Sequence, residues 1–282
     1  MNAIVTRFPV AADLHLTADV FEGSGRGIVM LAHGGGQTRH SWAKTGKTLA
    51  ERGWTAISLD LRGHGESDWS SEGDYQTHRF GEDLVAVAQA QAEKPHLIGA
   101  SLGGIAGLIA ETSVAPGTFR TLTLVDIVPN TDPQGSNRIL GFMGQNVETG
   151  FATLEEAADS ISAYLPHRER PKDLSGLRKN LREGADGRFR WHWDPKFITG
   201  MRRVSAPTAE ALQQPRYEDL ALPIHLVRGR MSELVSETAA QAFLTRLPNG
   251  SFTDVADAGH MVAGDRNDAF LEAVITFLER EG

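Results

Sequence analysis

The 282-residue sequence contains no cysteine. Disulfide bonds, thiolate nucleophiles and cysteine-based zinc sites are therefore excluded. The sequence also lacks an apolar run of the roughly 18 residues that a membrane-spanning helix requires. Its first residues show no basic stretch followed by a long apolar core, so no signal peptide is expected. These absences predict a cytoplasmic protein that has no membrane partner.

An excess of positive charge is missing as well. The formal net charge is −8, with 28 Lys and Arg against 36 Asp and Glu. A nucleic-acid partner would require a basic face, so the charge balance argues against one. With 40% hydrophobic and 23% charged residues, the composition is that of an ordinary globular protein. The length suits one large α/β domain, or such a domain with an insertion.

Short apolar runs alternate with segments of helical periodicity along most of the chain. Strands are expected at residues 4–9, 14–21, 27–36, 54–67, 96–101, 119–129, 223–229 and 250–256. Helices are expected at residues 41–53, 79–93, 102–113, 234–247 and 266–281. Such alternation is typical of a doubly wound, mostly parallel sheet, here with an antiparallel opening pair. The sequence therefore predicts the α/β class.

The alternation stops between about residues 130 and 215. This stretch holds no convincing strand, but it has helical pieces at 153–165 and 174–184 and an aromatic, basic run at 189–197. We therefore expect a core domain made of residues 1–129 and 216–282. A mainly helical insertion, residues 130–215, interrupts it.

A serine stands between glycines where a predicted strand meets a predicted helix, in "GASLGG" (99–104). The pattern G-x-S-x-G is weak alone, but this setting is the one a nucleophile elbow needs. Gly99 and Gly103 allow a sharp turn that leaves Ser101 exposed above the sheet. The sequence thus predicts a nucleophilic role for Ser101, whereas the bland alternative is a turn used only for close helix packing.

A serine hydroxyl needs an adjacent base to act as a nucleophile near neutral pH. His260 is the best-placed histidine, because it follows the last predicted strand, at the sheet edge where catalytic groups gather. The base in turn needs a carboxylate. Glu233 and Asp126 both follow strands, and we favour Glu233 because its loop is expected to neighbour that of His260. The alternative for Asp126 is a strand-end residue that bonds loop amides.

The glycines of "HGGG" (33–36) follow the first buried strand. Their backbone N–H groups are unobstructed, and the N–H of Gly35 could pair with that of Leu102 to stabilise an oxyanion. The alternative is a flexible turn in which His33 is structural.

Taken together, these motifs resemble the α/β-hydrolase superfamily, in its serine-nucleophile branch with a helical cap. The likeness rests on "HGGG", "DLRGHGES" (60–67), "GASLGG" and "AGHMV" (258–262). It implies the α/β-hydrolase fold, Ser101 as nucleophile, His260 as base and an acid in the "RGRMSE" loop, matching Glu233. It also implies an oxyanion hole at the N–H groups of Gly35 and Leu102, and a cap at about 130–215 that sets substrate choice. Relatives that open epoxides or displace halide carry a carboxylate at the position of Ser101, so those activities are disfavoured.

The leading hypothesis is a serine hydrolase, with neither cofactor nor metal, that cleaves a carboxylic ester or lactone through an acyl-enzyme. The expected partner is a small, hydrophobic substrate, and a homodimer stays open. A C–C bond hydrolase and a cofactor-free haloperoxidase or perhydrolase are alternatives on the same triad, and a non-catalytic ligand receptor is a third. A C–C hydrolase would need cations for a carboxylate-bearing substrate, and the insertion offers Arg190, Lys196, Arg202 and Arg203.

Several large apolar side chains of the insertion are candidates for a pocket roof or for packing against the core. They are Phe142, Met143, Phe151, Trp191, Trp193 and Phe197.

Overall fold

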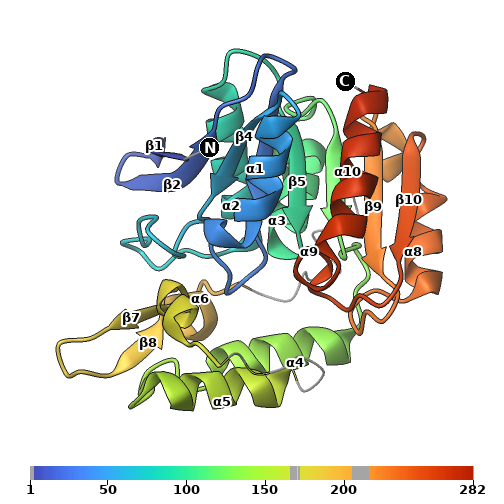
Figure 1. Cartoon of the computed structure of the whole chain (residues 1–282). Helices are drawn as coiled ribbons and strands as arrows, with labels where there is room; N and C mark the ends of the chain where they lie inside the picture. The colour runs from blue at the N-terminus through green and yellow to red at the C-terminus, as the bar shows by residue number, and fades with distance from the viewer. Residues whose placement is uncertain (1–2, 166–169, 171, 205–215, 282) are drawn as a thin grey trace.

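The computed structural model describes residues 3–165, 170, 172–204 and 216–281. In this part of the chain, eight strands form one sheet in the order β1-β2-β4-β3-β5-β6-β9-β10 (Figure 1). The strands are β1 (Ile4–Ala11), β2 (Leu14–Phe21), β3 (Ile28–Ala32), β4 (Thr55–Leu59), β5 (His96–Ala100), β6 (Leu122–Val125), β9 (Ile224–Gly229) and β10 (Gly250–Val255). The β1–β2 and β2–β4 pairs are antiparallel, and all other neighbours are parallel. The predicted α/β class and mostly parallel sheet are confirmed.

Helices cover both faces of this sheet. The helices α1 (Ala43–Glu51) and α10 (Asn267–Glu281) pack on one face, and α2 (Thr77–Gln89), α3 (Leu102–Ile109) and α8 (Glu237–Leu244) pack on the other. Two short turns, η1 (Arg39–Trp42) and α9 (Val262–Asp265), lie in the loops after β3 and β10. All five long core helices were predicted, with ends that differ by a few residues.

The central strands are mostly apolar because they are buried on both faces. In β3, Met30 and Ala32 belong to the core layer under α2 and α3, whereas Val29 and Leu31 belong to the layer under α1 and α10. This alternation follows from the two-residue period of a strand. Across the described residues, no helix has the length and apolar character needed to cross a membrane.

The segment between β6 and β9 lies apart from the sheet, beyond the carboxyl ends of the parallel strands (Figure 1). Its elements are α4 (Pro133–Gly144), α5 (Leu154–Tyr164), the turn η3 (Ser175–Asn180), β7 (Leu181–Glu183), β8 (Phe189–Trp191) and α6 (Lys196–Thr199). A final turn, η4 (Tyr217–Asp219), leads back to β9. Residues 205–215 of the predicted insertion lie outside the described residues.

Two expectations for this segment were wrong. The helix predicted at 174–184 is a 3₁₀ turn followed by β7, which pairs with β8 in an antiparallel ribbon. The helix α4 was missed because Pro133, Gly135 and Gly141 weaken the helical pattern. The structure explains why α4 forms nevertheless: Pro133 stands in its first turn, and the Asp132 carboxylate accepts hydrogen bonds from the N–H groups of Gln134 and Gly135.

Residues 181–204, here called the anchored half of the insertion, are fastened to the loop after β4. The ring of His192 accepts from the Gly65 N–H at 2.8 Å and contacts the Gly36 carbonyl oxygen at 3.2 Å. The Asp194 carboxylate accepts from the Tyr75 hydroxyl at 2.7 Å, and the Asp194 N–H donates to the Gly63 carbonyl at 2.9 Å.

Candidate active site

Ser101 stands on a strained turn between β5 and α3. Its backbone has φ 45° and ψ −111°, a conformation that costs energy for any residue with a Cβ. The turn requires glycine at two neighbouring positions: a Cβ on Gly99 would lie 2.5 Å from the backbone of Gly103, and one on Gly103 would lie 2.4 Å from the Ala32 carbonyl oxygen. The predicted strand–serine–helix turn is therefore present, and Ser101 lines the large pocket below the insertion.

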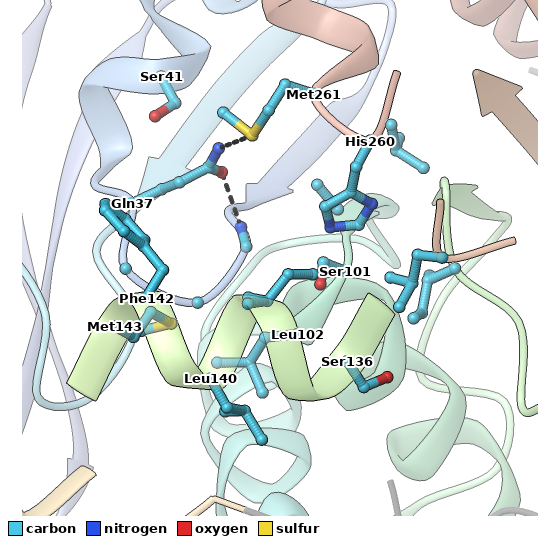
Figure 2. Close-up of a pocket in the computed structure, with 18 of the residues that line it drawn as sticks. Gln37, Ser41, Ser101, Leu102, Ser136, Leu140, Phe142, Met143, His260 and Met261 are labelled. Atoms are coloured by element: carbon cyan, nitrogen blue, oxygen red, sulfur yellow. Dashed lines mark hydrogen bonds between the residues drawn. The ribbon is translucent and has the colours of Figure 1, made fainter. Parts of the chain in front are cut away.

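His260 follows β10 and reaches the same pocket from the opposite end of the chain. Figure 2 shows its ring next to the Ser101 side chain. The Nδ1 atom of His260 lies 2.7 Å from Oδ2 of Asp126. Because a carboxylate only accepts, Nδ1 carries the proton, and Nε2 is left with the lone pair that a general base needs.

Asp126 is completely buried at the end of β6 and has a left-handed backbone, with φ 50°. Its Oδ1 accepts from the Gly229 N–H at 3.0 Å. Its Oδ2 accepts from the Ser232 hydroxyl at 2.5 Å as well as from His260. Three hydrogen-bond donors thus fix the position of the Asp126 carboxylate.

The expectation that Glu233 faces His260 was wrong. The Glu233 carboxylate is about one-third exposed and pairs with Arg138 of α4 at 2.5 Å. The loop after β9 does approach His260, but it presents Ser232 there, one residue earlier, and this hydroxyl bonds to Asp126. Ser232 was missed because a serine in that loop carries no charge or motif that marks it.

Two backbone amides, those of Gly35 and Leu102, are available near Ser101. Leu102 is the first residue of α3, so its N–H has no intrahelical acceptor. The neighbours of Gly35 are occupied: the Gly34 N–H donates to Oε1 of Gln37 at 3.0 Å and the Gly36 N–H to Nε2 of His64 at 3.1 Å. Within the described residues the Gly35 N–H has no acceptor, so both predicted amides can receive a ligand oxygen.

Three buried histidines hold the loop that carries the Gly35 amide against the loop after β4. The rings of His33, His64 and His192 lie in a row, with centroids 5.2 and 5.7 Å apart and planes tilted by 57° and 53°. Burial lowers the pKa of each ring to about 3, so all three are neutral at pH 7. Each ring nitrogen pairs with a backbone group of these loops. His33 is therefore a structural residue, which was one of the two alternatives that the sequence left open. The sequence did not predict that His64 and His192 also bond to these loops.

A buried arginine ties the same loops to the sheet. The Arg39 guanidinium contacts the carboxylates of Asp60, Asp19 and Glu66. Asp19 and Asp60 raise the pKa of Arg39 against the opposing effect of burial. The loops after β3 and β4 are therefore cross-linked below the pocket and positioned rigidly.

The pocket has a volume of about 440 Å³ and lies between the sheet edge and the insertion. Five of the six predicted roof residues line it: Phe142, Met143, Trp191, Trp193 and Phe197. The sixth, Phe151, packs behind Trp191, with ring centroids 5.0 Å apart. His260 is the one titratable side chain besides Tyr164 among the described lining residues, which include no Arg, Lys, Asp or Glu.

Among the residues that the structure describes, no three His, Asp or Glu side chains gather into a group that could hold a metal ion.

The strand order and the turn that carries Ser101 are those of α/β hydrolases. A family model described as alpha/beta hydrolase fold matches residues 27–266, and the chain belongs to this family. The resemblance to the α/β-hydrolase superfamily is thereby confirmed.

Similar proteins include several hydrolases. An esterase of Mycobacterium tuberculosis is 28% identical over 252 residues, covering 87% of this chain and 80% of its own. A 3-hydroxybutyrate-oligomer hydrolase of Cupriavidus necator is 27% identical over 247 residues, covering 83% of this chain and 82% of its own. The crystal structure of an α/β hydrolase from Novosphingobium aromaticivorans superposes with a TM-score of 0.83 at 24% identity, over 99% of both chains. The esterase and the oligomer hydrolase support a hydrolase, and the crystal structure supports the fold.

Proposed function

We propose that this chain is a serine hydrolase that cleaves an uncharged carboxylic ester or lactone. Ser101 is the nucleophile, His260 the general base and Asp126 the acid that orients it. The N–H groups of Gly35 and Leu102 form the oxyanion hole. The observation that carries the proposal is the 2.7 Å contact between His260 and Asp126, made in the pocket where Ser101 stands on its strained turn.

The reaction follows from these positions. Ser101 Oγ attacks the carbonyl carbon while its proton passes to Nε2 of His260, and the carbonyl oxygen becomes an oxyanion held by the two amides. His260 then protonates the leaving alkoxide, so the alcohol departs and an acyl-enzyme remains. Water attacks this ester, giving its proton to His260, and the acid leaves as Ser101 is reprotonated. Asp126 stays ionised and stabilises the imidazolium in both halves.

The pocket chemistry supports an uncharged substrate. Apolar side chains from α4, β8 and α6 form most of its roof, and no described lining residue would compensate a carboxylate or ammonium group on the substrate. We extend the proposal to the insertion as a whole: residues 130–215 act as a cap that selects the acyl and alcohol groups. A small-molecule partner and a cytoplasmic location remain parts of the same proposal.

The C–C hydrolase alternative is less well supported. Of its four candidate cations, none lines the pocket: Arg190 pairs with Asp186, Arg202 with Glu72, and the lining includes neither Lys196 nor Arg203. No observation favours a perhydrolase, a haloperoxidase or a non-catalytic receptor over an esterase. The esterase and the 3-hydroxybutyrate-oligomer hydrolase among the relatives point toward ester bonds.

The test is hydrolysis of 4-nitrophenyl esters of two to ten acyl carbons, with Ser101→Ala as the control. We expect turnover by the wild type and at most background rates for the variant. A fluorophosphonate probe should also label the wild type at Ser101, located by mass spectrometry, and leave the variant unlabelled. Equal rates for the two proteins across the whole series, or labelling elsewhere, would overturn the proposal.

A further inference from the structure

Gln37 places a side-chain amide in the pocket beside residues 33–36, here called the oxyanion loop. Its Oε1 accepts from the Gly34 N–H at 3.0 Å, and its own N–H donates to the Gly34 carbonyl at 3.1 Å. Its Nε2 points to the sulfur of Met261 at 3.0 Å, as the dashed lines in Figure 2 show. The amide orientation is fixed, because the Gly34 N–H can only donate and must face the oxygen of Gln37.

The Nε2 atom of Gln37 is poorly satisfied by this arrangement. A thioether sulfur is a weak acceptor, and the amide nitrogen has two protons to donate. Within the described residues Nε2 has no oxygen acceptor. Gln37 is only half-buried and lines the pocket, so a ligand oxygen can reach it and would be a better acceptor than Met261.

This donor lies close to the reacting atoms. A Cβ built on Gly34 would be 3.3 Å from Oε1 of Gln37 and 3.4 Å from Cβ of Ser101, so only the width of one residue separates the amide from the serine. Met261 directly follows His260 in the chain. Gln37 therefore lies between the loop after β3, which carries Gly35, and the loop after β10, which carries His260. It is within reach of substrate atoms a few bonds from the scissile carbonyl.

We propose that Gln37 is a specificity-determining residue that donates a hydrogen bond from Nε2 to a second oxygen of the substrate. The preferred ester then carries an ether, hydroxyl or carbonyl oxygen three or four bonds from the reacting carbonyl carbon. An all-alkyl ester of the same length leaves the amide with its sulfur contact. This inference rests on the esterase function proposed above and names the substrate class for the same site.

The test uses pairs of esters in which one oxygen replaces one methylene. On the acyl side the pair is 4-nitrophenyl 3-methoxypropanoate and 4-nitrophenyl pentanoate. On the alcohol side it is 2-methoxyethyl pentanoate and butyl pentanoate, followed by proton release. The measured quantity is the ratio of kcat/KM for the ether ester to kcat/KM for the alkyl ester. Effects of the ether on intrinsic reactivity cancel when the ratios of two enzyme variants are compared.

Three variants separate the donor from the loop contact. Gln37→Glu keeps an oxygen for the Gly34 N–H but removes the donor, and Gln37→Met removes both. Any disturbance of the oxyanion loop lowers both rates and cancels in the ratio. We expect the ratio to fall about three- to tenfold in both variants, for at least one of the pairs. In the matched control Met261→Leu, which removes the competing sulfur, the ratio should equal or exceed the wild-type value.

The outcomes are distinct from those that test the esterase function. If the pentanoates are hydrolysed in a Ser101-dependent manner but neither Gln37 variant changes either ratio, Gln37 only shapes the loop and this inference is wrong. If no ester is hydrolysed, the proposed function itself fails. Melting temperatures of the variants, read by circular dichroism, identify a variant that does not fold, and the other Gln37 variant then decides.

Discussion

Replacing each of the two acidic residues near the site by its amide separates their roles. In Asp126→Asn, the shape of the buried side chain is kept, and its oxygen can still accept from the Gly229 N–H. Its NH₂ group then faces Nδ1 of His260 as a donor. The imidazole must turn to the other tautomer, with the proton on Nε2, and it can no longer accept the proton of Ser101.

The size of the effect follows from that tautomer change. The same replacement in a trypsin-like triad lowers kcat about 10⁴-fold. We expect a fall of about 10³- to 10⁴-fold here, which corresponds to about 4–5.5 kcal/mol in the activation barrier. Glu233→Gln breaks only a partly exposed ion pair with Arg138, so kcat should change by less than about twofold and stability by less than about 1 kcal/mol.

The assay is steady-state hydrolysis of 4-nitrophenyl butyrate, with kcat and KM determined separately for both variants. The near-ultraviolet circular dichroism of Asp126→Asn should match that of the wild type, which shows that the buried site has kept its packing. Loss of activity in Glu233→Gln together with near-normal turnover in Asp126→Asn would refute the assignment of the acid.

Three further predictions concern the surroundings of the site. Ser232→Ala should lower kcat roughly tenfold at nearly unchanged KM, because Asp126 loses a donor that holds its Oδ2. Ser232→Thr keeps a hydroxyl and should restore part of the rate. An unchanged kcat in Ser232→Ala would show that this hydrogen bond does not position Asp126. Gly103→Ala should lower the free energy of unfolding in urea titrations by about 1–3 kcal/mol or more, because the new methyl group would clash with the Ala32 carbonyl. The control Gly141→Ala, at a helical position with open space around it, should be neutral or slightly stabilising. Burial lowers the pKa of His192 to about 3 in the folded protein, whereas the unfolded chain binds a proton there below about pH 6.5, so the free energy of unfolding should fall as the pH drops from 6.5 toward 3. His192→Gln should reduce the slope of the unfolding free energy against pH by about 1.4 kcal/mol per pH unit between about pH 5.5 and 4. An unchanged slope would contradict a buried, neutral His192.

The sequence was sufficient to predict those elements that depend on neighbouring residues alone. Strands such as β3 and β5 are short, apolar at nearly every position and bounded by glycine, proline or polar residues, so their limits are readable. The turn at Ser101 was predictable for a related reason: two close backbone approaches need glycine, and the motif records both.

The acid could not be chosen from sequence because its two candidates follow neighbouring strands, β6 and β9. Both lie at the edge of the sheet that His260 reaches. The left-handed backbone of Asp126 and the hydroxyl of Ser232 decide between them, and neither leaves a periodic signal.

The insertion was hard to predict for a different reason. Its elements are short, and they are stabilised by contacts with distant loops, such as those of His192.

The anchored half of the insertion has an implication for how new substrate ranges can arise. Residues 181–204 carry the hydrogen bonds of His192 and Asp194 to the core and supply Trp191, Trp193 and Phe197 to the lining. The preceding helix α4 supplies Ile139, Leu140, Phe142 and Met143. Exchange of α4 and α5 between homologues would thus remodel much of the chamber while leaving those hydrogen bonds untouched. Because the hydrogen bonds of His192 and Asp194 would survive such an exchange, α4 and α5 are the stretch of this chain best suited to grafting in the laboratory.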